Sequence, residues 1–60
     1  MKREEILKLN GELVTESQYD EIAEHEDVIS IENNGNSGRF VNKIWYSVYL
    51  TEDEEISIYL

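Results

Sequence analysis

The stretch that decides the fold runs from Arg39 to Leu60 and reads RFVNKIWYSVYLTEDEEISIYL. Alternate side chains of an extended strand share one face. One such face is mostly apolar and carries Phe40, Ile44, Tyr46, Val48 and Leu50, followed after an acidic loop by Ile56, Ile58 and Leu60. We therefore expect two antiparallel strands, Arg39–Leu50 and Ile56–Leu60, whose shared apolar face belongs to the core. If Thr51–Glu55 is a five-residue loop, Leu50 lies opposite Ile56 and Val48 lies opposite Ile58.

The other face of the same two strands is unusually aromatic. It carries Val41, Trp45, Tyr49 and Tyr59, separated by Lys43, Ser47 and Ser57. In the expected register Tyr59 lies opposite Ser47 and diagonal to Trp45 and Tyr49, within reach of both rings. Tyrosine and tryptophan are enriched at binding hot spots. The pattern predicts an aromatic patch that binds a partner or a second copy; the alternative is that another element packs on it.

Upstream residues predict one more strand and a helix. Val28–Ile31 is a short β-branched strand, and Asn33–Gly38 consists of turn-forming residues, which gives a three-stranded antiparallel meander over residues 28–60. Residues 15–27 predict a helix, because Thr15 and Gln18 have the spacing of a capping box. Its apolar stripe consists of Tyr19, Ile22 and Ala23.

The N-terminal segment has two interpretations. Asn10-Gly11 is a strong two-residue hairpin signal, and it separates the apolar stretches Ile6–Leu9 and Glu12–Val14. The alternative is a helical turn from Lys2 to Leu9, supported by Glu4 and Lys8 at i, i+4, with Asn10-Gly11 as its C-cap. We expect the hairpin, which gives an α+β fold in the order β-β-α-β-β-β within one small acidic domain, residues 1–60.

Acidity dominates the composition. The chain has 60 residues, with 14 Asp and Glu against 5 Lys and Arg, and a formal net charge of -9. Such a surface repels nucleic acid and anionic membranes and attracts basic proteins. Glu16, Asp20 and Glu24 follow i, i+4, i+8 spacing, which places successive carboxylates about 6 Å apart along a helix. That spacing is of the order of the distance between phosphates along a nucleic-acid strand.

The sequence contains no motif for catalysis, a cofactor or a metal. It has no cysteine and a single histidine, so a compact zinc site is not expected. His25 has no nucleophile or metal motif beside it that would indicate catalysis. The acidic loop residues Glu52, Asp53, Glu54 and Glu55 lack the spacing and glycine of an EF-hand. We expect a non-enzymatic protein without a cofactor, and, because no signal peptide or membrane span is recognisable, a cytoplasmic one.

In size, acidity and lack of cysteine the chain resembles small proteins of phages and prophages of Gram-positive bacteria. Some proteins of that kind imitate DNA and inhibit host DNA-binding enzymes, among them uracil-DNA glycosylase inhibitors and anti-CRISPR proteins. The resemblance implies an inhibitor of a nucleic-acid-acting protein. Glu16, Asp20, Glu24 and the Glu52–Glu55 loop would then supply charge, and Trp45, Tyr49 and Tyr59 the buried anchor. The alternative is a small structural homodimer whose acidic surface serves solubility.

Overall fold

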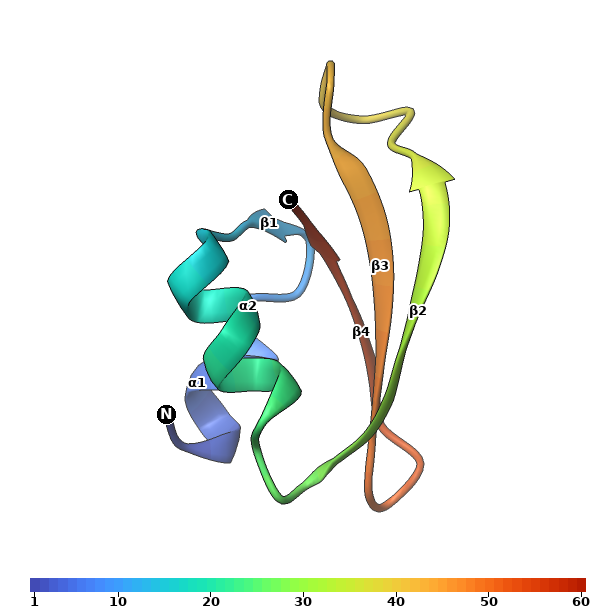
Figure 1. The fold of residues 1–60 in the computed structure, drawn as a ribbon. Coiled ribbons are helices and arrows are strands. Elements are labelled where there is room, and N and C mark those ends of the chain that lie inside the picture. The colour runs from blue at the N-terminus through green and yellow to red at the C-terminus, as the bar shows by residue number, and fades with distance from the viewer.

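The computed structural model describes residues 1–60 and contains two helices and one four-stranded sheet (Figure 1). In chain order the elements are α1 (Arg3–Lys8), β1 (Glu12–Leu13), α2 (Glu16–Ala23), β2 (Val28–Asn36), β3 (Ile44–Leu50) and β4 (Glu55–Tyr59). The strand order is β1-β4-β3-β2, and both helices lie on the same side of the sheet. The α+β class is confirmed, but the sheet has four strands where the sequence predicted five.

The predicted N-terminal hairpin is wrong, and the alternative helix is present as α1. Glu4 and Glu5 lie in its first turn and Lys8 in its last, which suits the helix dipole. The main-chain N–H of Lys2 donates to the Glu5 carboxylate at 2.9 Å. Ile6 is the buried residue of this helix. The helix ends at Lys8, and Gly11 takes a left-handed conformation with φ +83°, which redirects the chain.

After this turn the chain joins the sheet beside β4 and does not fold back on itself. Strand β1 pairs with β4 in parallel, and Leu13 lies opposite Tyr59. The Gly11 N–H donates to the Ser57 carbonyl at 2.7 Å, and the Ser57 N–H donates to Oδ1 of Asn10 at 2.9 Å. The residues that suggested a hairpin therefore fix the edge of a sheet whose partner strand lies at the other end of the sequence.

Helix α2 begins as predicted and ends early. The Gln18 N–H donates to Oγ1 of Thr15 at 3.1 Å, and the Thr15 N–H donates to Oε1 of Gln18 at 2.8 Å, so the capping box is confirmed. The helix stops at Ala23 because the following residues turn: the Asp27 N–H donates to Nδ1 of His25 at 3.0 Å. Ala23 is exposed, so it is not part of the predicted apolar stripe.

Strands β2, β3 and β4 are consecutive antiparallel neighbours, with boundaries that differ from the prediction. Strand β2 continues to Asn36, through much of the predicted turn, because Oδ1 of Asn33 accepts the Gly35 N–H at 2.7 Å inside a bulge. Strand β3 begins only at Ile44. Oγ of Ser37 accepts the N–H groups of Arg39 and Phe40, each at 3.0 Å, and this bends the chain before β3.

The register between β3 and β4 differs from the prediction by two residues. Val48 lies opposite Ile56 and Tyr46 opposite Ile58. The turn is tighter than expected, with Glu52 and Asp53 both at positive φ and the Leu50 N–H donating to the Glu54 carbonyl at 2.8 Å. A shift of two residues preserves which face each side chain occupies. The predicted core face is therefore correct for both strands.

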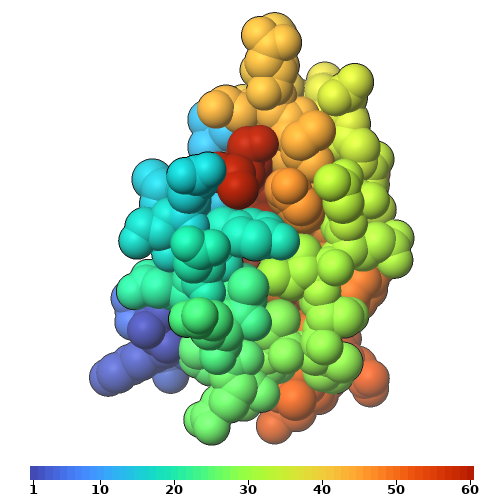
Figure 2. Space-filling view, in the orientation of Figure 1, coloured from blue at the N-terminus to red at the C-terminus, as the bar shows by residue number.

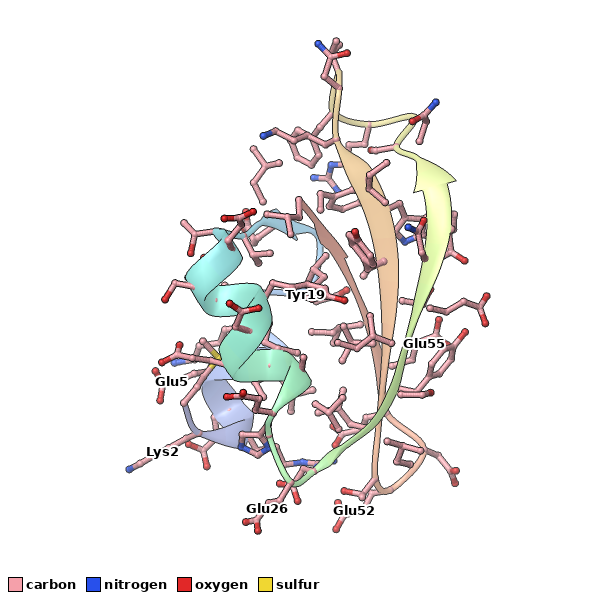
Figure 3. The ribbon with its side chains drawn as sticks, in the orientation of Figure 1. Lys2, Glu5, Tyr19, Glu26, Glu52 and Glu55 are labelled. Carbon is pink, nitrogen blue, oxygen red and sulfur yellow. The ribbon has the colours of Figure 1, made fainter.

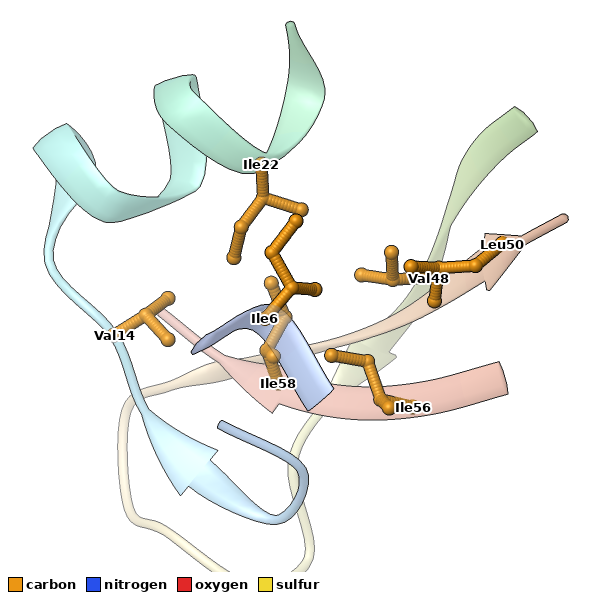
Figure 4. Packing of buried hydrophobic residues seen from close by; sticks show 7 residues of the cluster. All are labelled: Ile6, Val14, Ile22, Val48, Leu50, Ile56 and Ile58. Carbon is orange, nitrogen blue, oxygen red and sulfur yellow. The ribbon is translucent and has the colours of Figure 1, made fainter. Parts of the chain in front are cut away.

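The core lies between this face and the two helices (Figure 4). It consists of seven buried apolar residues from both helices, the sheet and the segment before α2: Ile6, Val14, Ile22, Val48, Leu50, Ile56 and Ile58. Tyr19 of α2 reaches toward the sheet (Figure 3), where its ring lies 5.1 Å from that of Tyr46. Phe40, predicted in the core, contacts Tyr59 on the other side of the sheet, with ring centroids 5.0 Å apart.

Candidate protein-binding surfaces

The first candidate surface is the outer face of the sheet, which we define as the face turned away from the helices. The predicted aromatic residues Trp45, Tyr49 and Tyr59 alternate with the core residues and so belong to this face. Trp45 lies directly opposite Tyr59, which corrects the predicted pairing of Tyr59 with Ser47. Trp45 is 38% exposed, while both tyrosines are half-buried.

Tyr59 is already engaged within the chain. The Phe40 ring meets it edge to face, and the Arg39 guanidinium lies over the Phe40 ring at 5.4 Å from its centroid. The bend at Ser37 brings both residues back over the sheet. Trp45 is therefore the more accessible residue of this aromatic pair, because the Tyr59 ring is already in contact with Phe40.

Small polar side chains separate Trp45 from Tyr49 on the outer face. Ser47 is only 3% exposed, and its Oγ accepts a hydrogen bond from Nδ2 of Asn34 at 2.7 Å. It lies opposite Ser57 on β4 and Glu32 on β2. Because Ser47 is short and nearly buried, the Trp45 and Tyr49 rings on either side of it form separate contacts.

Two residues of the outer face were not identified from the sequence. Leu13 is 47% exposed and lies opposite Tyr59. The parallel pairing of β1 with β4 has no local signal in the sequence. Glu32 belongs to this face because β2 continues past Ile31, the residue where the predicted strand ended. The alternation of Val28–Ile31, extended by one residue, was the only available signal for Glu32.

The acidic loop contains two kinds of carboxylate: those that interact with Arg3 and those that have no ion pair. Arg3 donates to Oγ1 of Thr51 at 2.8 Å, to the Thr51 carbonyl at 2.7 Å and to the Glu54 carboxylate. It also lies 3.5 Å from Asp27 and 3.8 Å from Glu52. The hydrogen bond to Glu54 raises the pKa of Arg3; partial loss of hydration lowers it, and the surrounding carboxylates raise it further.

Glu54 therefore ties this loop to α1, and Glu52 is drawn toward the same cation. Asp53 and Glu55 have no ion pair. Glu55 lies opposite Tyr49 on the outer face. Glu52 and Glu26 project from the same end of the molecule (Figure 3), the end at which β2 begins.

The second candidate surface is the acidic row of α2: Glu16, Asp20 and Glu24. All three are exposed, none forms an ion pair, and Glu24 is the C-cap residue. Asp20 and Glu24 are each two residues from the buried Ile22 and so lie about 200° around the helix from it. The acidic row therefore faces away from the sheet, on the side of the molecule opposite Trp45. One flat partner surface cannot contact both candidate surfaces.

The fold and these surfaces define a small acidic α+β domain whose sheet is covered by helices on one face only. No protein-family model, curated protein or solved structure matches this chain. The structure contains no pocket and no group of three or more side chains able to hold a metal ion. Neither helix has the length and apolar character needed to cross a membrane.

Proposed function

We propose that this protein is a non-enzymatic binding module that acts in the cytoplasm by occupying a basic surface of a nucleic-acid-acting protein. The observation that carries the proposal is an uncovered sheet face on which an exposed Trp45 lies diagonal to the unpaired carboxylate of Glu32, with the unpaired Glu55 farther along the same face, opposite Tyr49. An aromatic anchor surrounded by charge is a common design for a protein-binding surface.

The charge balance supports a basic partner. Only Asp27, Glu52 and Glu54 form ion pairs, all with Arg3. Of the 14 acidic residues, 14 − 3 = 11 therefore have no ion pair within the chain. Such a surface attracts a basic partner over long range and accelerates association at low salt.

The acidic row supports a partner that normally binds nucleic acid. Like charges at i, i+4 destabilise an isolated helix, and no basic residue lies in the last turn of α2 to offset them. A basic groove that follows a phosphate backbone would match carboxylates spaced about 6 Å apart. In this proposal the acidic row imitates a short run of phosphates, while the outer face offers a separate aromatic contact.

The experiment begins with capture of binding proteins from a lysate, salt elution and identification, followed by affinity measurements with the purified partner. The triple variant Glu16→Lys, Asp20→Lys, Glu24→Lys reverses the acidic row. The control triple variant Glu4→Lys, Glu12→Lys, Glu21→Lys reverses three exposed carboxylates outside the acidic row, one of them on another face of α2, and changes the net charge equally. We expect the first to weaken binding and its salt dependence far more than the second.

Equal losses from both triple variants would mean that only total charge matters, and unchanged affinity in both would refute the mimic. Trp45→Ser is measured in parallel, because it tests the outer face independently of the acidic row. A loss of affinity with Trp45→Ser alone would place the partner on the outer face and remove the imitation of nucleic acid from the proposal.

A further inference from the structure

The sheet has two edges, and they differ in how well they are protected. Strand β1 is only two residues long, while β2 has nine residues and forms the other edge. In Figure 2 the yellow-green atoms of β2 lie along the right-hand margin of the molecule. A long open edge is a template for pairing with another strand unless charges, proline or distortion block it.

The hydrogen-bond pattern identifies which main-chain groups of β2 are free. Ile44 and Leu60 exchange two main-chain hydrogen bonds, of 2.9 and 3.0 Å, so the even-numbered residues of β3 bond to β4. Because bonding direction alternates along a strand, the odd-numbered residues of β3 bond to β2. Ser47 is paired with Glu32. The N–H and C=O groups of Ile31 and Asn33 therefore point to the open edge.

The composition of this edge is unlike that of the rest of the chain. Strand β2 contains one charged residue, Glu32, and neither lysine nor proline. The other 51 residues therefore carry -9 − (-1) = -8 of the net charge. Bulges lie between Val28 and Ser30 and between Asn33 and Asn36, which leaves Ser30–Asn33 as the regular stretch. A nearly neutral edge suits a nearly neutral strand better than a basic peptide.

We propose that β2 of one molecule pairs antiparallel with β2 of a second copy, so that two sheets join into one of eight strands. In the register that places Ile31 opposite Ile31 of the second copy, Glu32 lies opposite Ser30 and avoids the other Glu32. Ile29, which is 68% exposed, belongs to the bulge just before this regular stretch and lies near Asn33 of the second copy. Cross-strand β-branched pairs stabilise a sheet, and opposed like charges destabilise it.

The two ends of β2 are complementary in charge. Glu26 and Glu52 project near its beginning, while Lys43 lies near its end, where the Ser37 N–H donates to the Lys43 carbonyl at 2.8 Å. Antiparallel pairing about a two-fold axis brings the acidic end of each copy to the basic end of the other. This dimer leaves the outer face and the acidic row exposed. The dimer proposal can therefore be tested independently of the proposed function.

The test is sedimentation of the full chain from about 10 μM to about 1 mM protein, the range in which weak self-association is measurable. We expect a species of twice the 7.1 kDa chain mass that becomes more populated as salt rises, since salt screens the repulsion between two acidic copies. Asn33→Pro removes the outward N–H and should weaken the dimer at least about tenfold. The matched control Asn33→Ala keeps that N–H and should leave the dimer intact.

A charge swap and hydrogen exchange give independent readouts. Lys43→Glu should weaken the dimer, and adding Glu26→Lys to it should restore association. In the unsubstituted chain, the amide protons of Ile31 and Asn33 should exchange more slowly as the protein concentration rises. A monomer at every concentration and salt would overturn the proposal. So would a dimer that survives Asn33→Pro without concentration-dependent protection of these amides.

Discussion

The turn between β3 and β4 should become more stable if its two acidic residues are replaced by Asn-Gly. Glu52 and Asp53 have φ values of 65° and 61°. Two successive residues at positive φ in a hairpin turn strongly favour Asn-Gly. Glutamate is poorly suited to this conformation, while aspartate tolerates it better. The double variant Glu52→Asn, Asp53→Gly keeps the observed backbone, removes the steric cost at Asp53 and reduces it at Glu52, because asparagine tolerates this conformation better than glutamate.

The expected gain follows from the two positions taken separately. A left-handed conformation costs a non-glycine residue roughly 1–2 kcal/mol, with aspartate near the lower end. Glycine returns roughly 0.4–1 kcal/mol of that gain through the greater freedom of the unfolded chain. Loss of the Glu52–Arg3 contact matters little, since the Glu52 side chain is 83% exposed. The net gain is about 1 kcal/mol, which for this length raises Tm by about 8 °C.

The assay is thermal unfolding followed by circular dichroism, checked by urea denaturation. The control Glu52→Gln, Asp53→Ser removes the same two charges but leaves side chains at positive φ. We expect little change in its Tm. An equal rise in both variants would show that charge repulsion, and not backbone conformation, sets the cost. No rise in the Asn-Gly variant would refute the left-handed turn itself.

Three further predictions concern packing and anchoring. Ile22→Ala should cost about 2–4 kcal/mol in urea unfolding, because Ile22 is the one buried residue of α2; Ile22→Val should cost about 1 kcal/mol. Arg3→Gln should lower Tm, and more so at low salt, because it leaves Glu54 and its neighbouring carboxylates without their cation; Arg3→Lys should fall between. Asn10→Ala should cost about 0.5–1.5 kcal/mol, since Oδ1 of Asn10 accepts the Ser57 N–H in an exposed hydrogen bond, and should expose that amide to faster hydrogen exchange.

The features that could be predicted from the sequence depend on neighbouring residues. The capping box requires only Thr15 and Gln18, three positions apart, and both hydrogen bonds are present. The core face required only the parity of Val48 and Ile56, which a register shift of two residues does not alter. Trp45 was assigned to the opposite face by the same alternation, and it is one of the exposed large apolar residues.

The features that could not be predicted depend on residues far apart in the sequence or on unfavourable backbone conformations. Asn10-Gly11 predicts a hairpin only if its flanks pair with each other, whereas Leu13 pairs with Tyr59 near the other end of the chain. The tight turn uses Glu52 at positive φ, a choice that conformational preference argues against. Phe40 contacts Tyr59 outside the core because hydrogen bonds to the Ser37 hydroxyl bend the chain before β3. Strand periodicity gives no sign of this bend.

The distribution of charge connects the two proposals. Carboxylates that served only solubility could lie anywhere, yet this chain holds them where they cost stability: in the acidic row of α2 and at positive φ in the β3–β4 turn. Because α2 ends at Ala23, Glu26 and Asp27 lie outside it and do not oppose its dipole, and Asp27 pairs with Arg3. The cost is therefore concentrated in Asp20, Glu24 and the turn, since Glu16 lies in the first turn of α2, where a carboxylate suits the dipole. Conversely, charge is nearly absent along β2, where an open edge would ordinarily carry it. Acidic residues thus lie where they cost stability and are missing from the open edge, where they would be useful. This charge pattern is expected of two binding surfaces, an acidic one for a basic partner and a neutral edge for a second copy.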